Sequence, residues 1–442
     1  MLSAQTPPLP VTLPEDLLPG LRDVLHRALQ ESPQMISHNL DLAAQEANRY
    51  QQAAQLWPSL SGNFNYAYNQ SVLTSNANTN TRSSGLVFSV NLYQPIFHWG
   101  ALEAVKDISH LQIKISERRY AEAYGQLATT LRSQYLSLIA QKVQLRNVRF
   151  SIGQTKTAVA VVEDRFKSGT ATQDELTNAH LQLDEANLNL DRTVDGFAYS
   201  QHLFALTAGV PELSDAAVPD EIPKPVYAAD TTAALLRNFV HDGLNNTFEV
   251  KIYDYQIRQS DLNYKIAKYR LYPRFDLALG VNEQNQTNAT TSAISQTSVL
   301  SDYVALAASW NIFDGFATRG ARLAALTSKR QAERDRTTYV DQTLAQAHEM
   351  ERQLEFSARA MSIAEQRFGL SAQAWQRAKD DFKLHNLSQA EMDQATISFY
   401  QSQSAIFGAR ADFLSQWSGY LSLLGIDPVL NNLPASFTSN AK

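Results

Sequence analysis

The segment RFKSGTATQDEL at residues 165–176 returns as DFKLHNLSQAEM at residues 381–392. The offset is 216 positions (381 − 165), and it persists downstream, where Gly209 corresponds to Gly425. Upstream the correspondence slips by one residue, because LWP at 56–58 matches LYP at 271–273, whereas IF at 96–97 matches IF at 312–313. A repeat this long predicts a doubled architecture in which each half is an ordered set of elements, rather than a short solenoid unit.

Composition excludes several classes of protein. The 442 residues include 38 basic and 44 acidic side chains, giving a net charge of −6 without a basic tract, which argues against nucleic acid as a partner. The absence of cysteine removes disulfides and thiolate chemistry. The nine histidines lack metal-ligand spacing, and no phosphate loop, nucleophile elbow or paired-carboxylate signature occurs. We therefore predict no enzyme activity, no metal and no cofactor.

Membrane and export signals of the usual kind are missing. No run of 18 apolar residues predicts a transmembrane helix. The first eight residues have neither a charged region nor an apolar core, so we do not interpret them as a signal peptide. The sequence leaves open whether this is a cytosolic protein or the mature form of an exported one.

Two stretches alternate with a period of two and predict β-hairpins at 60–97 and 274–313, each with one apolar face. Polar loops are expected at 71–84 and 283–301. The apolar faces contain Phe64, Tyr66, Tyr68, Leu86, Phe88 and Val90 in the first hairpin, and Leu277, Leu279, Leu306 and Trp310 in the second.

A very long helical pattern follows each hairpin. Hydrophobic residues recur every seven positions from Tyr124 to Phe166 and from Val340 to Phe382. A strict seven-residue period predicts left-handed supercoiling against partner helices. Long helices are expected at 101–168 and 316–384, each spanning roughly 100 Å, and return helices at 172–208 and 388–424.

These elements give the following predicted organisation. The fold is mostly α with a small β part. An N-terminal extended segment covers 1–20, and the first structural repeat, which starts with a helix, covers 21–210. A linker with four prolines covers 211–231, the second repeat covers 232–426, and a C-terminal tail covers 427–442.

The order helix, strand, loop, strand, long helix, tip turn and return helix, repeated once, resembles the TolC family of outer-membrane efflux proteins. The shared local sequences are Ala28-Leu29 with Ser32-Pro33, the YQPIF segment at 93–97 before Gly100, the tip at 165–176, and 206–209 at the end of the half. The resemblance covers roughly residues 21 to 426.

The resemblance implies a homotrimer with a twelve-stranded β-barrel in the outer membrane of a Gram-negative-type bacterium and an α-helical barrel in the periplasm. It implies a passive exit duct for efflux or type I secretion, opened by a periplasmic adaptor protein and an inner-membrane transporter. An oligomer is also expected on physical grounds, because four strands cannot close a barrel and open edges are not viable in lipid. The number three comes from the family. The ten apolar strand residues above would then face outer-membrane lipid.

The resemblance places a gate at the second tip. Its candidates are Phe382, Leu387, Glu391, Asp393, Gln394, Asp380 and Asp381. Leu387 and Gln394 stand where some members carry an arginine and an acid, so we expect Phe382 and Leu387 to close the gate by packing. Both Glu175 and Glu391 also fit the capping box [ST]-x-x-E, and we expect each to cap a helix first.

In the family, adaptor hairpins dock at the tips. The resemblance therefore makes these residues the docking candidates of this chain: Phe166, Gly169, Thr170, His385 and Asn386, together with Phe382. Gly169 fits a turn that requires a positive φ, and we expect Asn386 to take that conformation in the second tip. The alternative for all of these is an ordinary turn.

The rival hypothesis is a soluble coiled-coil scaffold protein, which explains the heptads but leaves the four strands without a role. The sequence does not select a substrate, because drug efflux, protein secretion and metal export share the duct that the resemblance implies.

Overall fold

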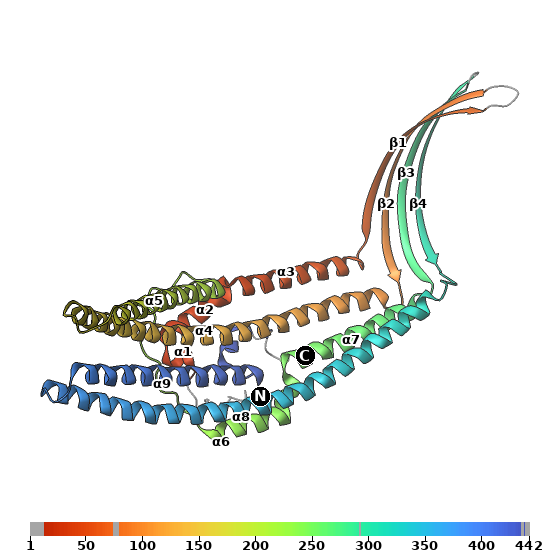
Figure 1. Ribbon diagram of the computed structural model, residues 1–442. Coiled ribbons are helices and arrows are strands. Elements are labelled where there is room, and N and C mark those ends of the chain that lie inside the picture. Colours follow the sequence, from red (N-terminus) through yellow and green to blue (C-terminus); the bar gives the residue numbers. More distant parts are fainter. Residues whose placement is uncertain (1–12, 74–78, 291–292, 435–436, 438–442) are drawn as a thin grey trace. The chain divides into compact units, whose positions relative to one another are not determined.

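A computed structural model describes residues 13–73, 79–290, 293–434 and 437 (Figure 1). It confirms the predicted class, since long helices dominate and one antiparallel sheet of four strands accompanies them. Among the described helices, none combines the length and the apolarity that a membrane-crossing helix requires.

The chain forms two compact units, and each contains segments of both sequence repeats. One unit consists of residues 1–41, 117–251 and 337–442, and the other of residues 42–116 and 252–336. Four helices contribute residues to both units: α3 (Pro33–Ala54), α4 (Ala101–Lys167), α7 (Phe248–Tyr269) and α8 (Ala317–Lys383).

In the first unit, α4 and α5 (Gln173–Ala208) form one helical hairpin, and α8 and α9 (Gln389–Leu423) form the other. The predicted heptads supply the core: Tyr124, Leu131, Leu138, Leu145, Ile152 and Val159 of α4 are all buried. The side-chain amide of Asn147 on α4 donates to the carbonyl of Tyr400 on α9 (3.1 Å), so the two hairpins adjoin along these helices.

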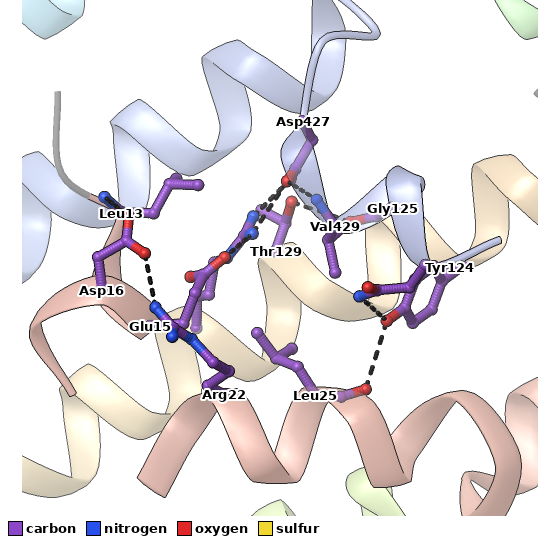
Figure 2. Close-up of polar contacts among 12 residues, drawn as sticks. Leu13, Glu15, Asp16, Arg22, Leu25, Tyr124, Gly125, Thr129, Asp427 and Val429 are labelled. Atoms are coloured by element: carbon purple, nitrogen blue, oxygen red, sulfur yellow. Dashed lines mark hydrogen bonds and ion pairs between the residues drawn. The ribbon is translucent and has the colours of Figure 1, made fainter. Parts of the chain in front are cut away.

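A buried cluster of charges connects both ends of the described chain to α4 (Figure 2). Arg132 is completely buried. Its Nε donates to Glu15 of α1 (Pro14–Leu17) at 2.8 Å, and its Nη2 donates to Asp427 at 2.9 Å. Burial alone would lower the pKa of the guanidinium, but hydrogen bonds and charge from Asp427 and Glu15 outweigh it and raise that pKa.

The prediction of an extended N-terminal segment is wrong for its described part. Pro14 opens α1 and Pro19 opens α2 (Pro19–Glu31), each within the first two helical positions. Proline suits that place because its φ is already helical and its missing N–H would have no partner there. Residues 1–12 lie outside the described part.

After the linker, α6 (Ala229–Asn238) passes through a π-turn, η1 (Phe239–Gly243), and a 3-10 turn, η2 (Leu244–Asn246), before α7. A last 3-10 turn, η3, covers Pro428–Asn432.

The sheet of the second unit has the order β1-β2-β3-β4, so β1 (Ser59–Leu73) and β4 (Ile294–Ser309) form its edges. The inner strands are β2 (Thr79–Phe97) and β3 (Arg274–Ala289). The strands extend into both predicted polar loops, because ladder hydrogen bonds do not depend on apolar side chains. Residues 74–78 and 291–292 of those loops lie outside the described part.

Replacing Arg132 by methionine should destabilise the protein by about 3–5 kcal/mol, because two carboxylates then lose their buried counter-charge. Chemical unfolding of the detergent-solubilised protein, followed by circular dichroism, measures the change. The matched control is Arg27→Met, which removes a solvent-exposed ion pair with Glu31 and should change the free energy of unfolding little. Adding Glu15→Gln and Asp427→Asn to Arg132→Met should restore most of the loss. Equal instability of the single and triple variants would contradict this account of the cluster.

Candidate functional site

The first tip joins α4 to α5 through a Schellman turn. Gly169 has φ +72°, and its amide donates to the carbonyl of Phe166 (3.0 Å). The amide of Thr170 donates to the carbonyl of Arg165 (2.8 Å). This pair of bonds satisfies the last carbonyls of the helix, and it needs a left-handed residue at position 169.

The second tip repeats this geometry with a different residue. The amides of His385 and Asn386 donate to the carbonyls of Phe382 and Asp381, each at 3.0 Å. His385 is the left-handed residue, with φ +58°, and the expectation that Asn386 takes this role is wrong. His385 corresponds to Gly169 at the offset of 216. The hydrogen bonds of the turn require a left-handed backbone at this position, whichever residue occupies it.

Both return helices begin with a capping box, which confirms the prediction that Glu175 and Glu391 cap helices. Thr172 caps α5 with Glu175, and Ser388 caps α9 with Glu391. Hydrogen bonds from the side chain and the backbone of Ser388 lower the pKa of Glu391 below its usual 4.5. The stabilisation from the ionised cap is therefore complete above pH 4.5 and is lost as the pH falls through the lower value.

The remaining gate candidates surround the same turn. Phe382 and Asp380 lie in the last turns of α8, and hydrogen bonds from Gln376 and Lys383 lower the pKa of Asp380. Leu387 is half-buried directly before the cap residue. Asp393 accepts a hydrogen bond from the side chain of Gln389 (2.7 Å). Asp381 and Gln394 are exposed. The turn therefore gathers all seven candidates within one short segment, 380–394.

An aromatic cluster behind the second tip was not identified from the sequence as a unit. Trp375 of α8 stacks on Phe399 of α9 with ring centroids 4.8 Å apart, and its indole N–H donates to Thr396 (3.1 Å). Trp375 belongs to the seven-residue series from Val340 to Phe382, which is the signal that the sequence offers for it. The equivalent position to Trp375 in the first hairpin is Val159.

The sheet register places nine of the ten predicted apolar strand residues on one face, and the tenth, Trp310, directly follows the end of β4. Opposed residues of antiparallel strands share a face, and Phe64 is opposite Phe88 while Leu277 is opposite Leu306. The apolar runs at 60–68 on β1 and 86–92 on β2 lie opposite one another. The β2 run lies opposite 279–285 on β3, whereas the β3 run covers 275–281, so the apolar band is displaced along the ladder between these two strands. On β4 it covers 300–308, where Asp302 interrupts it.

The opposite face is polar and almost uncharged. Within the described strands it carries mainly asparagine, glutamine, serine, threonine and small residues, and its only charged residues are Arg274 and Asp276. Its larger side chains include Val87, Tyr93 and Val299. Tyr303 lies on this face over Gly280, and its hydroxyl donates to Asn91 (3.0 Å). A Cβ at position 280 would lie 2.5 Å from the Tyr303 ring, so only glycine fits there.

A second cluster lies where β2 meets α4, and sequence reasoning missed it. His98 contacts buried Asp276 at 2.7 Å. The indole N–H of Trp99 donates to the carbonyl of Pro273 (2.8 Å). These partners are more than 170 positions apart, and the sequence carries no local signal for the pairing. Within the described part of the chain, no group of three or more histidines or acids could hold a metal ion.

Comparison with known proteins gives one family. A family model described as "Outer membrane efflux protein" matches residues 24–193 and 240–425. A comparison with curated protein sequences found no match.

Several solved structures share the fold at low sequence identity. The outer membrane channel CmeC of Campylobacter jejuni superposes with a TM-score of 0.69 at 12% identity, covering 99% of this chain and 95% of that one. A membrane protein of Pseudomonas aeruginosa gives 0.65 at 17% identity, with coverage of 96% and 99%. The open state of the MtrE outer membrane channel of Neisseria gonorrhoeae gives 0.61 at 13%, with coverage of 96% and 97%.

Replacing His385 by glycine should stabilise the second tip by about 0.5–1 kcal/mol. Left-handed backbone costs roughly 1–2 kcal/mol for a residue with a Cβ, and the larger conformational entropy of glycine in the unfolded chain offsets part of that gain. Hydrogen exchange of residues 382–391, followed by mass spectrometry, should slow. The matched control, Gly169→Ala in the first tip, should accelerate exchange there. Faster exchange in His385→Gly would contradict the assignment of strain to this residue.

Proposed function

The chain belongs to the outer membrane efflux protein family, and we propose that it is the outer-membrane exit duct of an efflux or secretion system. In this proposal it is a homotrimer in the outer membrane of a Gram-negative-type bacterium and extends into the periplasm. It provides a passage and performs no chemistry.

The apolar sheet face is the observation that carries this proposal. A face with Phe64, Tyr66, Phe88 and Leu306 exposed on a four-stranded sheet needs an apolar environment. Its displacement along the ladder between β2 and β3 is in keeping with strands that cross a slab of lipid at a tilt. The opposite face, which carries only Arg274 and Asp276 as charged residues within the described strands, suits the wall of a water-filled lumen.

The sheet edges support assembly from several copies. β1 and β4 would expose unpaired backbone groups to lipid, where each costs several kcal/mol. Three copies would supply twelve strands and close the barrel, and the number three follows from the family. The fold alone does not distinguish drugs, proteins or metal ions as cargo.

We assign the entrance to the tips. Phe382 and Leu387, with Glu391, Asp393, Gln394, Asp380 and Asp381 around them, would close the passage. Phe166, Gly169, Thr170, His385 and Asn386 would dock a periplasmic adaptor. An inner-membrane transporter would supply the energy, and the helical hairpins would relax outward to open the entrance.

The detergent-corrected mass of the membrane-extracted protein tests the function. Light scattering should give a particle of about three chains that aggregates once detergent is removed, because lipid-facing strands require an apolar solvent. A monodisperse monomer in plain buffer would refute the duct and favour the soluble coiled-coil scaffold.

Replacing Phe382 and Leu387 together by alanine should raise single-channel conductance in planar bilayers, because the gate would lose its packing side chains. The matched control is Phe166→Ala in the first tip, which removes an equivalent ring outside the proposed gate and should leave conductance unchanged. Unchanged conductance in the double variant would refute a gate closed by packing.

A further inference from the structure

The two junctions between a hairpin and its long helix have the same backbone but different surroundings. Residues 99 and 100 between β2 and α4 both have positive φ, and so do residues 315 and 316 between β4 and α8. The β2 junction lies inside the sheet and is covered. The β4 junction lies at the sheet edge, where Phe313 and Phe316 are 69% and 68% exposed.

Within the chain, the β2 junction is covered by the segment that leads from α7 into β3. Trp99 packs edge-on against Tyr272, with ring centroids 5.0 Å apart. Lys265 of α7 reaches Gly100, where its Nζ would lie 2.9 Å from an added Cβ. His98 pairs with Asp276 at the start of the sheet.

The sequence repeat provides the equivalent surfaces. At the offset of 216, Trp99 and Gly100 in the first half correspond to Gly315 and Phe316 in the second. At the offset of 215, Lys265 and Tyr272 in the second half correspond to Tyr50 and Trp57 in the first. Register supports both offsets, because residues related by them lie on the same face of the sheet. Tyr50 and Trp57 belong to the segment from α3 into β1, at the other edge of the sheet, and they are 68% and 71% exposed.

We propose that the β4–α8 junction of one copy packs against the α3–β1 segment of the next copy, as the β2–α4 junction packs against the α7–β3 segment within the chain. Phe316 then meets the partner copy's Tyr50, and Gly315 meets its Trp57. The interface is head-to-tail, since the two surfaces differ, and a closed ring of copies covers every exposed junction. This inference rests on the proposed function and specifies which residues hold the copies together.

The residue sizes at the two junctions are complementary. Within the chain, the large ring of Trp99 contacts Tyr272, while Gly100 leaves room for Lys265. At the edge the order is reversed: Gly315 leaves room for the large ring of Trp57, and Phe316 supplies a ring for Tyr50. Aromatic pairs of this kind favour edge-to-face or offset packing and are frequent in interface centres.

Backbone strain at Phe316 also points to an external contact. A phenylalanine at φ +69° is costly, and such strain persists where other contacts fix it. Within the chain its ring contacts Phe313, which is itself exposed. The partner copy's Tyr50 supplies the contact that the chain leaves open.

The strain gives a variant that separates assembly from folding. Phe316→Gly removes the ring and also relieves the left-handed backbone, so the helices and the sheet should form as before. We expect its trimer in detergent to dissociate at a protein concentration at least about tenfold higher than wild type, as measured by light scattering. Tyr50→Ala should have a similar effect, and combining the two should add little, because each removes the same contact. The matched control is Phe356→Ala, which removes another exposed ring from α8 and should leave dissociation unchanged.

Cross-linking tests the pairing directly, because the chain has no cysteine of its own. Tyr50→Cys combined with Phe316→Cys should give covalent dimers and trimers with a short thiol-specific bifunctional reagent. Neither single variant should do so. The control pair, Tyr50→Cys with Phe356→Cys, uses an exposed phenylalanine 40 positions further along α8 and should stay uncross-linked.

The outcomes distinguish this inference from the proposed function. A wild-type trimer that cross-links at 50 and 316 and weakens in Phe316→Gly supports the inference. A wild-type trimer that conducts ions, but neither cross-links nor weakens, overturns the inference alone and identifies these rings as lipid contacts. A monomeric wild-type protein overturns both.

Discussion

The unsatisfied backbone at the two edges of a four-stranded sheet constrains this protein more than any other feature. An edge in water can be protected by charges or a bulge, but an edge beside an apolar face has no such solution. β1 and β4 are long, and the face between them carries rows of exposed aliphatic and aromatic side chains. In the proposed assembly, these edges meet other edges of the same kind. The doubled sequence provides them, since the second strand of each half can pair with the first strand of the next half.

Sequence predicted the features that depend on local chemistry or on periodicity. Thr172 and Ser388 were recognised as caps because the capping box needs only residues three positions apart. The heptads predicted the buried face of α4, and the alternation predicted that Phe64 shares a face with Tyr66 and that Leu277 shares one with Leu279. The strand ends were missed, because beyond Tyr68 and Val281 the alternation of apolar and polar residues stops while the backbone pairing continues.

Features that depend on distant partners gave no sequence signal. Arg132 lies 117 positions from Glu15 and 295 from Asp427, and each residue taken alone resembles an ordinary surface charge. A buried guanidinium between two carboxylates is a poor source of net stability, but the loss of any member is costly. It therefore makes the attachment of the chain's ends to α4 specific. His98 and Asp276 illustrate the same limit in the sheet, where the register, which sequence did not supply, brings them together.

The two helical hairpins are equal in topology but unequal in energy, and this difference bears on which one would move. The first tip has glycine at its left-handed position, whereas the second holds His385 there at a cost. A strained turn needs less free energy to open, so the second tip is the weaker of the two. The stack of Trp375 on Phe399 and the Ser388 cap stabilise the helices on either side of it. Opening would thus be confined to the short segment between them, which contains Phe382 and Leu387. A gate needs this combination, because a local change of shape must not unwind the helices that transmit it.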